Sequence, residues 1–509
     1  MDYTDQNQRP LLEALYAYAA ENRISWHMPG HNNGEAWPLS FRGNLASIDT
    51  TELAVTDDLN HPEGPARHAM LLASKAFGSG YTRFLTSGST TAIQLLLAAA
   101  VGTDGKMLVA RTCHQSVVHA AACLNIELIL FHQTGYPEHE NQLHPKFSLF
   151  PQATQRDVEV AMDENPNCRT VWLTSPDYYG NCAAIRQIAD CVHQRGGRLL
   201  VDEAHGAHFC FAEGLLPPSA LKSGADAAVQ SGHKTLPVLT GGALLHISQD
   251  ALDNGSLPAE EVDRLLPVFQ SSSPSFPIAA SLDYARSSMV EEGRERVLEQ
   301  LALFVNFGLD LDPRLICRPE RTSLSLSAQG IDYDPLRLVV TTREPAWLFV
   351  VKALAAQLHR LKMDIEYADL TRLVLIPSLW QTRENWQLLA SVLNESVRSL
   401  SFQSTEGLQQ GTKLMELEEK WRNFLPPRSA DRSLTAREAL LGKQKRQYVP
   451  LSESAGYYAA RPLAPYPPGV PIIWPGERID AEAVDFMTVL LENSISISGM
   501  TNDQVPVIM

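Results

Sequence analysis

Lys234 and Asp202 are the two residues of this chain whose types and spacing most directly suggest chemistry. Asp202 ends the apolar run 199–201, and Lys234 follows the apolar run 227–230. These runs predict two buried strands, separated by one helix, whose carboxyl ends lie where open α/β sheets bind ligands. A desolvated amine suits imine formation with an aldehyde, and a buried carboxylate suits a protonated ring nitrogen. Pyridoxal phosphate (PLP) has both groups, so the pair predicts a PLP site.

A run of small and hydroxyl-bearing residues, Thr86–Thr91, comes directly before a predicted helix over 92–100. Small residues let backbone amides approach an anion, hydroxyls add donors, and a helix N-terminus supplies positive potential. The run therefore predicts a phosphate cradle, although ordinary helix capping explains the same residues. Plainer explanations also exist for Asp202, as a helix cap, and for Lys234, as a surface lysine in a turn. The occurrence of all these features in one chain favours the cofactor site.

Several histidines are further candidates. His114 follows a predicted strand over 106–110, where its ring could stack on a flat heteroaromatic ring or simply bond locally at a helix start. His205 and His208 lie in one loop after Asp202. No set of carboxylates and histidines has convincing metal-ligand spacing, so the sequence predicts no metal site.

Short apolar runs alternate with helical stretches from about residue 81 to 246, which predicts a mostly parallel sheet covered on both faces. The predicted strands are 106–110, 126–131, 170–173, 198–201 and 227–230, and the predicted helices include 114–124 and 185–193. Elsewhere the pattern predicts helices over 11–22, 290–305 and 347–361, a loop over 29–34, and strands over 338–342, 363–366 and 373–377. Polar stretches at 403–411 and 426–429 indicate linkers, and prolines exclude a helix over 464–471. We expect an N-terminal arm (1–45), a large cofactor-binding domain (46–290), a small α/β domain (291–400) and a C-terminal domain (401–509).

Composition excludes several classes of protein. The net charge of −16 argues against binding to nucleic acid or to anionic membranes. The seven cysteines are scattered and form no Cys-x-x-Cys pair, which indicates reduced thiols. The first residues lack the apolar core of a secretory signal, and the richest apolar run, 92–101, is too short to span a membrane. We therefore expect a soluble, cytoplasmic protein.

Five motifs occur in a specific order along the chain. They are Ser-Gly-Ser-Thr (87–90), Thr-Cys-His-Gln-Ser (112–116), Asp-Glu-Ala-His-Gly-Ala-His (202–208), Ser-Gly-His-Lys (231–234) and Ser-Ser-Pro-Ser-Phe (272–276). His-Met-Pro-Gly-His (27–31) precedes them, and Pro-Tyr-Pro-Pro-Gly-Val-Pro (465–471) and Pro-Gly-Glu (475–477) follow. This set resembles the Orn/Lys/Arg decarboxylases of PLP fold type I, in the short form without an N-terminal wing domain. The resemblance implies an aspartate aminotransferase-like large domain, a smaller α/β domain and a C-terminal domain.

The resemblance also implies roles for individual residues. Lys234 would hold PLP covalently, and Asp202 would bond its ring nitrogen. His114 would stack on one face of the ring, with Ala204 on the other and His205 nearby. The phosphate would be served by Ser89, Thr90, Ser231 and His233. Ser272, within the segment 271–275, would reach the cofactor of a neighbouring subunit, which implies a homodimer or a larger even-numbered homo-oligomer.

By the same resemblance the reaction would be decarboxylation of arginine, lysine or ornithine to CO2 and a polyamine-pathway amine, with His233 or Lys234 returning a proton to Cα. Three positions depart from the family pattern. Gln115 replaces a usual lysine, Asn32 and Asn33 follow the Pro-Gly-His motif in place of lysine, and Arg461 occupies a usually acidic position. A cation at 461 would repel a basic substrate tail if it faced the pocket, which leaves the choice of amino acid open.

Two other functions remain open at this point. An aminotransferase or another PLP lyase would fit the same fold, with Arg461 or Arg286 as a candidate clamp for the substrate carboxylate. A non-catalytic homologue that regulates a decarboxylase is the second alternative. The presence of both Lys234 and Asp202 argues against it, because such a protein does not need the cofactor-binding amine.

Overall fold

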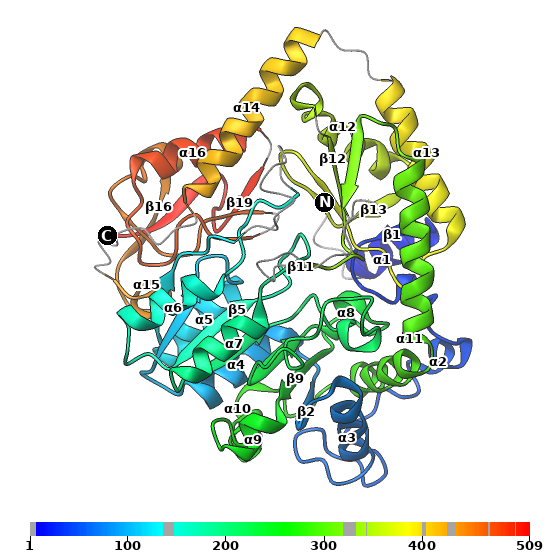
Figure 1. Ribbon diagram of the computed structural model, residues 1–509, viewed down its shortest axis with the longest axis vertical. Coiled ribbons are helices and arrows are strands. Elements are labelled where there is room, and N and C mark those ends of the chain that lie inside the picture. The colour runs from blue at the N-terminus through cyan, green and yellow to red at the C-terminus, as the bar shows by residue number, and fades with distance from the viewer. Residues whose placement is uncertain are drawn as a thin grey trace.

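The computed structural model describes residues 7–135, 147–318, 332–342, 344–399, 404–424, 434–466, 469–493 and 495–509. Its central feature is a seven-stranded sheet in the order β2-β9-β8-β7-β5-β3-β4 (Figure 1). The strands are β2 (Tyr81–Leu85), β3 (Lys106–Ala110), β4 (Glu127–Phe131), β5 (Thr170–Thr174), β7 (Arg198–Asp202), β8 (Ala227–Gln230) and β9 (Ala243–Ile247). Strand β9 alone runs opposite to the other six strands of this sheet. The predicted mostly parallel sheet is therefore confirmed.

Alternation of side chains along β7 explains why helices cover both faces of the sheet. Leu200 packs on one face in a core shared with α4 (Gly88–Ala100), α5 (Gln115–Leu124) and α10 (Ala259–Phe269). Leu199 and Val201 point the other way, into a core shared with α6 (Gln155–Glu164) and α7 (Ile185–Gln194). Because successive residues of a strand face opposite sides, a continuous apolar run requires cover on both faces.

The helix predicted between Asp202 and Lys234 is wrong. The chain there forms a short 3-10 turn at Phe209–Phe211 and reaches β8 through a loop. Gly214 takes a φ of +78°, and Pro217 and Pro218 follow it, so this stretch cannot propagate a helix. The strand order is unaffected, since β7 and β8 are still parallel neighbours.

A second, smaller α/β unit follows the long helix α11 (Phe276–Asp310), which leads out of the large sheet region (Figure 1). Its four-stranded sheet has the order β10-β12-β15-β14 and is antiparallel throughout. A separate pair joins β1, from the N-terminal segment, to β13 in parallel. The elements are β1 (Ile24–Trp26), β10 (Leu315–Arg318), β12 (Leu338–Thr342), α12 (Val350–Arg360), β13 (Met363–Ile365), β14 (Tyr367–Ala368), β15 (Leu373–Leu375) and α13 (Arg383–Ser399).

The C-terminal part begins with α14 (Ser404–Arg422), so the linker predicted over 403–411 is wrong for residues 404–411. Leu414, Leu417 and Trp421 are buried at helical spacing, and the polar stretch before them extends the same helix. The second predicted linker, 426–429, lies outside the described residues. The remaining elements are α15 (Ala436–Leu441), β16 (Arg446–Pro450), β17 (Tyr458–Ala459), β18 (Ala464–Tyr466), α16 (Ala481–Glu492), β19 (Ser496–Ser498) and β20 (Gln504–Ile508).

Buried ion pairs connect the C-terminal part to both other units. Arg111, just after β3, donates to both carboxylate oxygens of Glu477 at 2.9 and 2.7 Å. Arg372, just before β15, donates to Glu418 of α14 at 2.8 and 2.9 Å. Removing one partner of such a pair would leave an uncompensated buried charge, so these contacts fix how the units are oriented.

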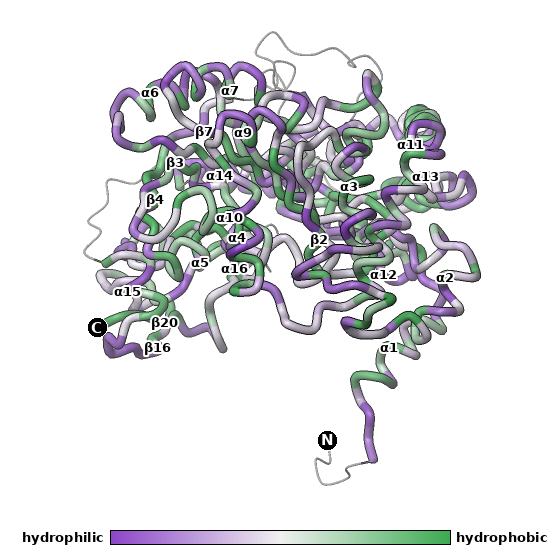
Figure 2. The backbone as a smooth tube through the Cα atoms, turned by 90° about the horizontal axis from the view of Figure 1, so that it is seen from below, coloured by the Kyte–Doolittle hydropathy of each residue, from purple (hydrophilic) through white to green (hydrophobic). Residues whose placement is uncertain are grey.

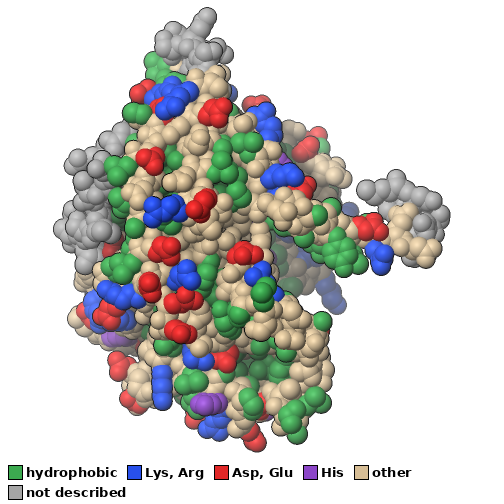
Figure 3. Space-filling view, turned by 90° about the vertical axis from the view of Figure 1, so that its right-hand side faces the viewer, with side chains coloured by type: hydrophobic (Ala, Val, Ile, Leu, Met, Phe, Trp, Pro, Cys, Tyr) green, Lys and Arg blue, Asp and Glu red, His purple; other side chains and the backbone are tan. Residues whose placement is uncertain are grey.

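The surface has a protruding N-terminal helix and mixed charges (Figure 2 and Figure 3). Helix α1 (Pro10–Ala20) has no buried residue and extends away from the rest of the chain (Figure 2). Acidic and basic side chains are interspersed on the face in Figure 3, so the net negative charge is not gathered into one patch there. In the described part of the chain, no helix combines the length and apolar character needed to cross a bilayer.

Candidate active site

The amine and the carboxylate singled out in the sequence come together at the carboxyl ends of β7 and β8. Asp202 is the last residue of β7, and Lys234 lies in the single-turn helix α8 (Gly232–Thr235) that follows β8. Burial lowers the pKa of Lys234 to about 8, and the nearby negative charge of Asp202 opposes this shift. The free amine is therefore accessible near neutral pH, as a lysine that reacts with an aldehyde requires.

The surroundings of Asp202 fit a protonated ring nitrogen as its partner. Its carboxylate is buried and accepts a hydrogen bond from the amide of Ala204 at 3.1 Å, the only donor to it among the described residues. Burial raises its pKa, and the charge of Lys234 opposes the rise. A buried carboxylate with so few donors is poorly compensated, and the pyridinium of PLP would supply the missing cationic partner.

His114 is held in a fixed orientation at the start of α5. Its Nδ1 accepts from the amide of Ser116 at 3.2 Å and lies 2.8 Å from the Ser116 hydroxyl, so it is the N-cap of the helix. His114 is exposed in this single chain, and the protein around its ring lowers its pKa, by desolvation first and then by the charge of Lys234. Capping and ring stacking are thus compatible, because Nδ1 fixes the ring while its faces stay free.

The predicted phosphate cradle lies at the N-terminus of α4. This helix begins at Gly88, four residues earlier than predicted, so Ser89 and Thr90 belong to its first turn. The Ser231 hydroxyl, from the loop before Lys234, donates to the Ser89 hydroxyl at 2.8 Å. The Gly88 amide donates to the Gly241 carbonyl at 2.7 Å, which ties this turn to the segment after α8. The donor set of a 13-residue helix N-terminus with paired hydroxyls suits a phosphate.

The Pro-Gly-His motif supports the loop that contains Lys234. The Gly30 amide donates to the His233 carbonyl at 2.8 Å, and a Cβ on Gly30 would lie 2.7 Å from the Leu236 carbonyl oxygen. Only glycine allows so close an approach of two backbones. His233 is fixed in turn, because its Nδ1 donates to the Gly242 carbonyl at 3.1 Å. Burial lowers the pKa of His233, which favours the neutral ring.

The two asparagines that replace the family's lysine after this motif have a backbone role. Asn32 and Asn33 take φ values of 50° and 54°, in the left-handed region that asparagine tolerates better than most residues. Their side chains donate to the Trp380 carbonyl at 3.4 Å and to the Arg23 carbonyl at 3.1 Å.

Three residues at this site were not recognised in the sequence: Arg337, Glu366 and Tyr178. His205 Nε2 lies 2.9 Å from Lys234 Nζ, and Arg337 Nη2 lies 3.0 Å from His205 Nδ1. Glu366 accepts hydrogen bonds from the Tyr178 hydroxyl and, at 3.3 Å, from the Met28 amide, and its charge raises the pKa of Lys234.

Arg337 and Glu366 were missed because they belong to the small domain, more than a hundred residues from Lys234, and no motif identifies them. The signal that could have identified them was their position at the ends of predicted strands. Arg337 directly precedes the strand predicted over 338–342, and Glu366 ends the one predicted over 363–366.

Other predicted residues lie elsewhere. Ser272 is exposed in this single chain. Arg286 forms an ion pair with Asp283 at 2.6 Å, three residues earlier in α11, and Arg461 is exposed. Arg286 is therefore already paired with a carboxylate of its own helix, and Arg461 faces solvent.

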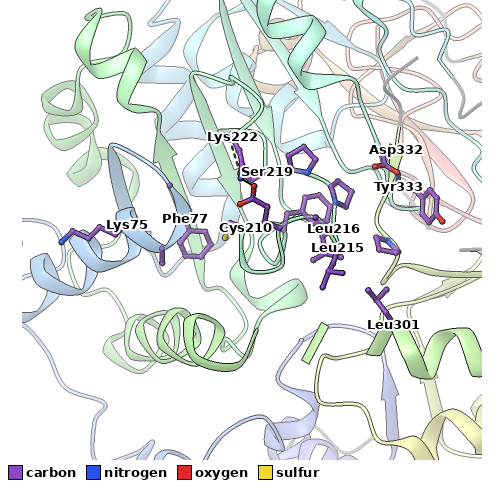
Figure 4. A pocket seen from close by; sticks show the side chains of 18 residues that line it. Lys75, Phe77, Cys210, Leu215, Leu216, Ser219, Lys222, Leu301, Asp332 and Tyr333 are labelled. Carbon is purple, nitrogen blue, oxygen red and sulfur yellow. Dashed lines mark hydrogen bonds and ion pairs between the residues drawn. The ribbon is translucent and has the colours of Figure 1, made fainter. Parts of the chain in front are cut away.

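A cavity of about 700 Å³ is lined by a different set of residues (Figure 4). Its lining is mainly apolar, with Phe77, Leu215, Leu216 and Leu301, and it also includes Asp332. It contains none of the predicted site residues.

Comparisons with known proteins identify the family. The model of the Orn/Lys/Arg decarboxylase major domain matches residues 9–313, and that of the family's C-terminal domain matches residues 419–504. The uncharacterized protein YaaO of Bacillus subtilis is 32% identical over 501 residues, covering 96% of each chain. The arginine decarboxylase of Halalkalibacterium halodurans is 28% identical over 504 residues, 98% of this chain and 96% of that protein.

A solved structure extends the comparison to three dimensions. The Escherichia coli constitutive lysine decarboxylase superposes with a TM-score of 0.73 at 17% identity, covering 100% of this chain and 83% of that chain. At this identity the likeness concerns the fold, which is that of PLP fold-type-I enzymes. Since the major-domain model alone matches more than half of the sequence, the chain belongs to the Orn/Lys/Arg decarboxylase family.

Proposed function

We propose that this protein is a PLP-dependent carboxy-lyase that converts arginine, lysine or ornithine into CO2 and the corresponding amine. The proposal rests on the buried Lys234 amine, whose pKa of about 8 keeps it reactive, beside the poorly compensated carboxylate of Asp202. Family membership and the names of the relatives, arginine decarboxylase and lysine decarboxylase, support the reaction class.

When bound, PLP supplies an electron sink for the pair left at Cα as the bond to the carboxylate breaks. The residues of this chain prepare that step. Lys234 provides the covalent attachment point, Asp202 favours a protonated ring nitrogen, and the fixed ring of His114 orients the cofactor plane. Ser89 and Ser231, whose hydroxyls are hydrogen-bonded to each other at the start of α4, would bind the phosphate. Lys234, once free, or His233 returns the proton to Cα.

Product analysis tests the proposal. The purified PLP-loaded protein should release CO2 and a primary amine from at least one of the three basic amino acids, with no 2-oxo acid present. A strict requirement for a 2-oxo acid would indicate an aminotransferase instead. Absence of both products with all three amino acids would contradict the proposal.

Glu366 offers a reason for the preference for basic amino acids. Its carboxylate has a negative potential that reaches the Lys234 amine, where the substrate would be attached. A cationic side chain extending from Cα would be attracted to it, whereas the exposed Arg461 would repel that tail little because solvent screens its charge.

We therefore expect Glu366→Gln to raise KM for the basic substrate by about 10-fold or more, the scale of one lost hydrogen bond to a charged group. The effect on kcat should be smaller, because the contact is remote from the breaking bond. Steady-state kinetics would measure both values, with the exposed Glu384→Gln on α13 as a matched control. An unchanged KM in Glu366→Gln would exclude this carboxylate from substrate recognition.

We also propose that the active form is a homodimer. The segment around Ser272 is exposed in the single chain, and helix α1 buries none of its own residues. Both features are consistent with a partner subunit that covers them and with Ser272 reaching the partner's cofactor. Sedimentation velocity would test the assembly.

A further inference from the structure

A buried chain of contacts connects the small domain to the Lys234 amine. Arg337 Nη2 is 3.0 Å from His205 Nδ1, and His205 Nε2 is 2.9 Å from Lys234 Nζ. Arg337 is 1% exposed and His205 is 5% exposed, so neither interaction competes with bulk water. The three residues come from the segment before β12, the loop after β7, and α8.

The donors and acceptors in this chain determine where each proton lies. A guanidinium has five N–H donors and no acceptor, so His205 Nδ1 must accept from Arg337. A neutral imidazole that accepts at Nδ1 has its proton on Nε2. That Nε2–H can donate to Lys234 only if Nζ has a lone pair, because an ammonium group has no acceptor.

The alternative, in which Lys234 is an ammonium group that donates to His205, is disfavoured. If Lys234 were an ammonium donating to a bare Nε2, the ring proton would lie on Nδ1 and would face an N–H of Arg337. Two donors would then oppose each other in a buried site, which costs the hydrogen bond and adds repulsion. A doubly protonated His205 would face the same conflict, and burial lowers the pKa of His205 well below its ordinary value.

The backbone around Arg337 fixes its position. A Cβ on Gly180, which has a φ of +92°, would lie 2.7 Å from the Arg337 Cβ. The Gly180 carbonyl accepts from the Asp334 amide at 2.7 Å, and Asp334 also lies 3.2 Å from His208. Arg337 Nε and Nη1 are buried and have no partner among the described residues. Because the guanidinium is buried and its Nη2 contacts His205, it can act on Lys234 through the imidazole.

We infer that Arg337 is a positioning residue that selects the Nε2–H tautomer of His205 and thereby favours the neutral amine of Lys234 over the ammonium form whenever Lys234 is not covalently bound. Its catalytic value rests on the proposed function, since a neutral amine is the form that attacks an aldehyde. The protonation state itself does not depend on turnover and can be measured without it.

Other charged and titratable groups also act on these residues. Asp202 and Glu366 raise the pKa of Lys234, whereas Arg337 lowers it. His114 and His233 lie close enough to His205 to lower its pKa, and the Tyr178 ring contacts the His205 ring at 4.9 Å between centroids. The positive charge of Arg337 alone would therefore favour a neutral Lys234, so a test must separate charge from hydrogen bonding.

Substitutions at Arg337 can make this separation in the full-length protein freed of PLP. Arg337→Lys keeps both the charge and a donor, Arg337→Gln keeps only a donor, and Arg337→Met keeps neither. The apparent pKa of Lys234 would be obtained from the pH dependence of its acetylation by acetic anhydride, followed by mass spectrometry of the peptide that contains it. Circular dichroism would verify the fold of each variant.

We expect Arg337→Lys to stay near the wild-type value and Arg337→Met to raise the apparent pKa by about one unit more than Arg337→Gln does. In a His205→Phe background the difference between Gln and Met should vanish, because the coupling passes through the imidazole. Equal shifts of the apparent pKa in Arg337→Gln and Arg337→Met would show that only the charge of Arg337 acts on Lys234, and would overturn the inference. The absence of a shift in both variants would overturn it as well.

A second measurement needs no substitution at Arg337. Nitrogen-15 chemical shifts of labelled histidine distinguish the two neutral tautomers, and a His205→Gln difference spectrum would identify His205 among the fifteen histidines. We expect the proton on Nε2, and a proton on Nδ1 would overturn the inference. Either result leaves the decarboxylase proposal to be judged by its own product analysis.

Discussion

Replacing Lys234 by alanine should reduce amine formation from the basic substrate by at least roughly 10⁴-fold, the scale observed when a covalent catalytic group is removed. The variant loses the attachment point for the cofactor and a group that can return the proton to Cα. Its fold should persist, because the Asp202 carboxyl that remains can take up a proton, its pKa being raised by burial. Turnover would be measured by amine release and folding by thermal melting.

Lys106→Ala is a suitable control for that experiment. Lys106 lies on β3 of the same sheet and forms an exposed ion pair with Glu127 at 2.8 Å. Exposed pairs contribute little to stability, so this variant should keep full activity. If Lys234→Ala retained activity close to that of the control, Lys234 could not be the covalent residue.

Asp202→Asn should lower turnover by roughly 10²- to 10³-fold, comparable to the loss of one preorganised electrostatic partner. Asparagine has nearly the same shape but no negative charge to favour a protonated ring nitrogen. Steady-state turnover at saturating PLP would separate this effect from weakened cofactor binding. Glu203→Gln is the matched control, because Glu203 is the next buried carboxyl and bonds instead to the Ala220 amide and Gln230.

The same substitution should stabilise the protein when PLP is absent. Burial raises the pKa of Asp202, so the folded state binds this proton more tightly than the unfolded chain does. The free energy of unfolding therefore falls as pH rises above about 4, the ordinary value for aspartate. We expect PLP-free Asp202→Asn to melt above wild type at about pH 8 and the difference to shrink toward about pH 4. If PLP-free Asp202→Asn melted at a lower temperature than wild type at every pH, burial of the Asp202 carboxylate would not be the cause of this pH dependence.

The large domain could be predicted from the sequence because its signals are local. The strands 106–110 and 227–230 match the structure residue for residue, since continuous apolar runs bounded by polar residues admit few alternatives. The carboxyl ends of β7 and β8 lie side by side because these two strands are parallel neighbours, which is why the sequence could pair Lys234 with Asp202.

The loop before β8, the start of α14 and the site residues of the smaller unit could not be predicted, because they depend on information that the local sequence does not contain. Glycine and prolines in the loop before β8 prevented the helix predicted there, and the polar start of α14 is helical because apolar residues later in the same helix pack against the core. Arg337 and Glu366 reach the site only through packing between the two α/β units. A pattern within one segment cannot reveal contacts that tertiary structure creates.

Borohydride reduction of the purified PLP-loaded protein, followed by proteolysis and mass spectrometry, tests most directly whether Lys234 is the covalent partner of the cofactor. We expect a stable pyridoxyl group on the peptide that contains Lys234. A pyridoxyl group on a different lysine, with Lys234 unmodified, would contradict it.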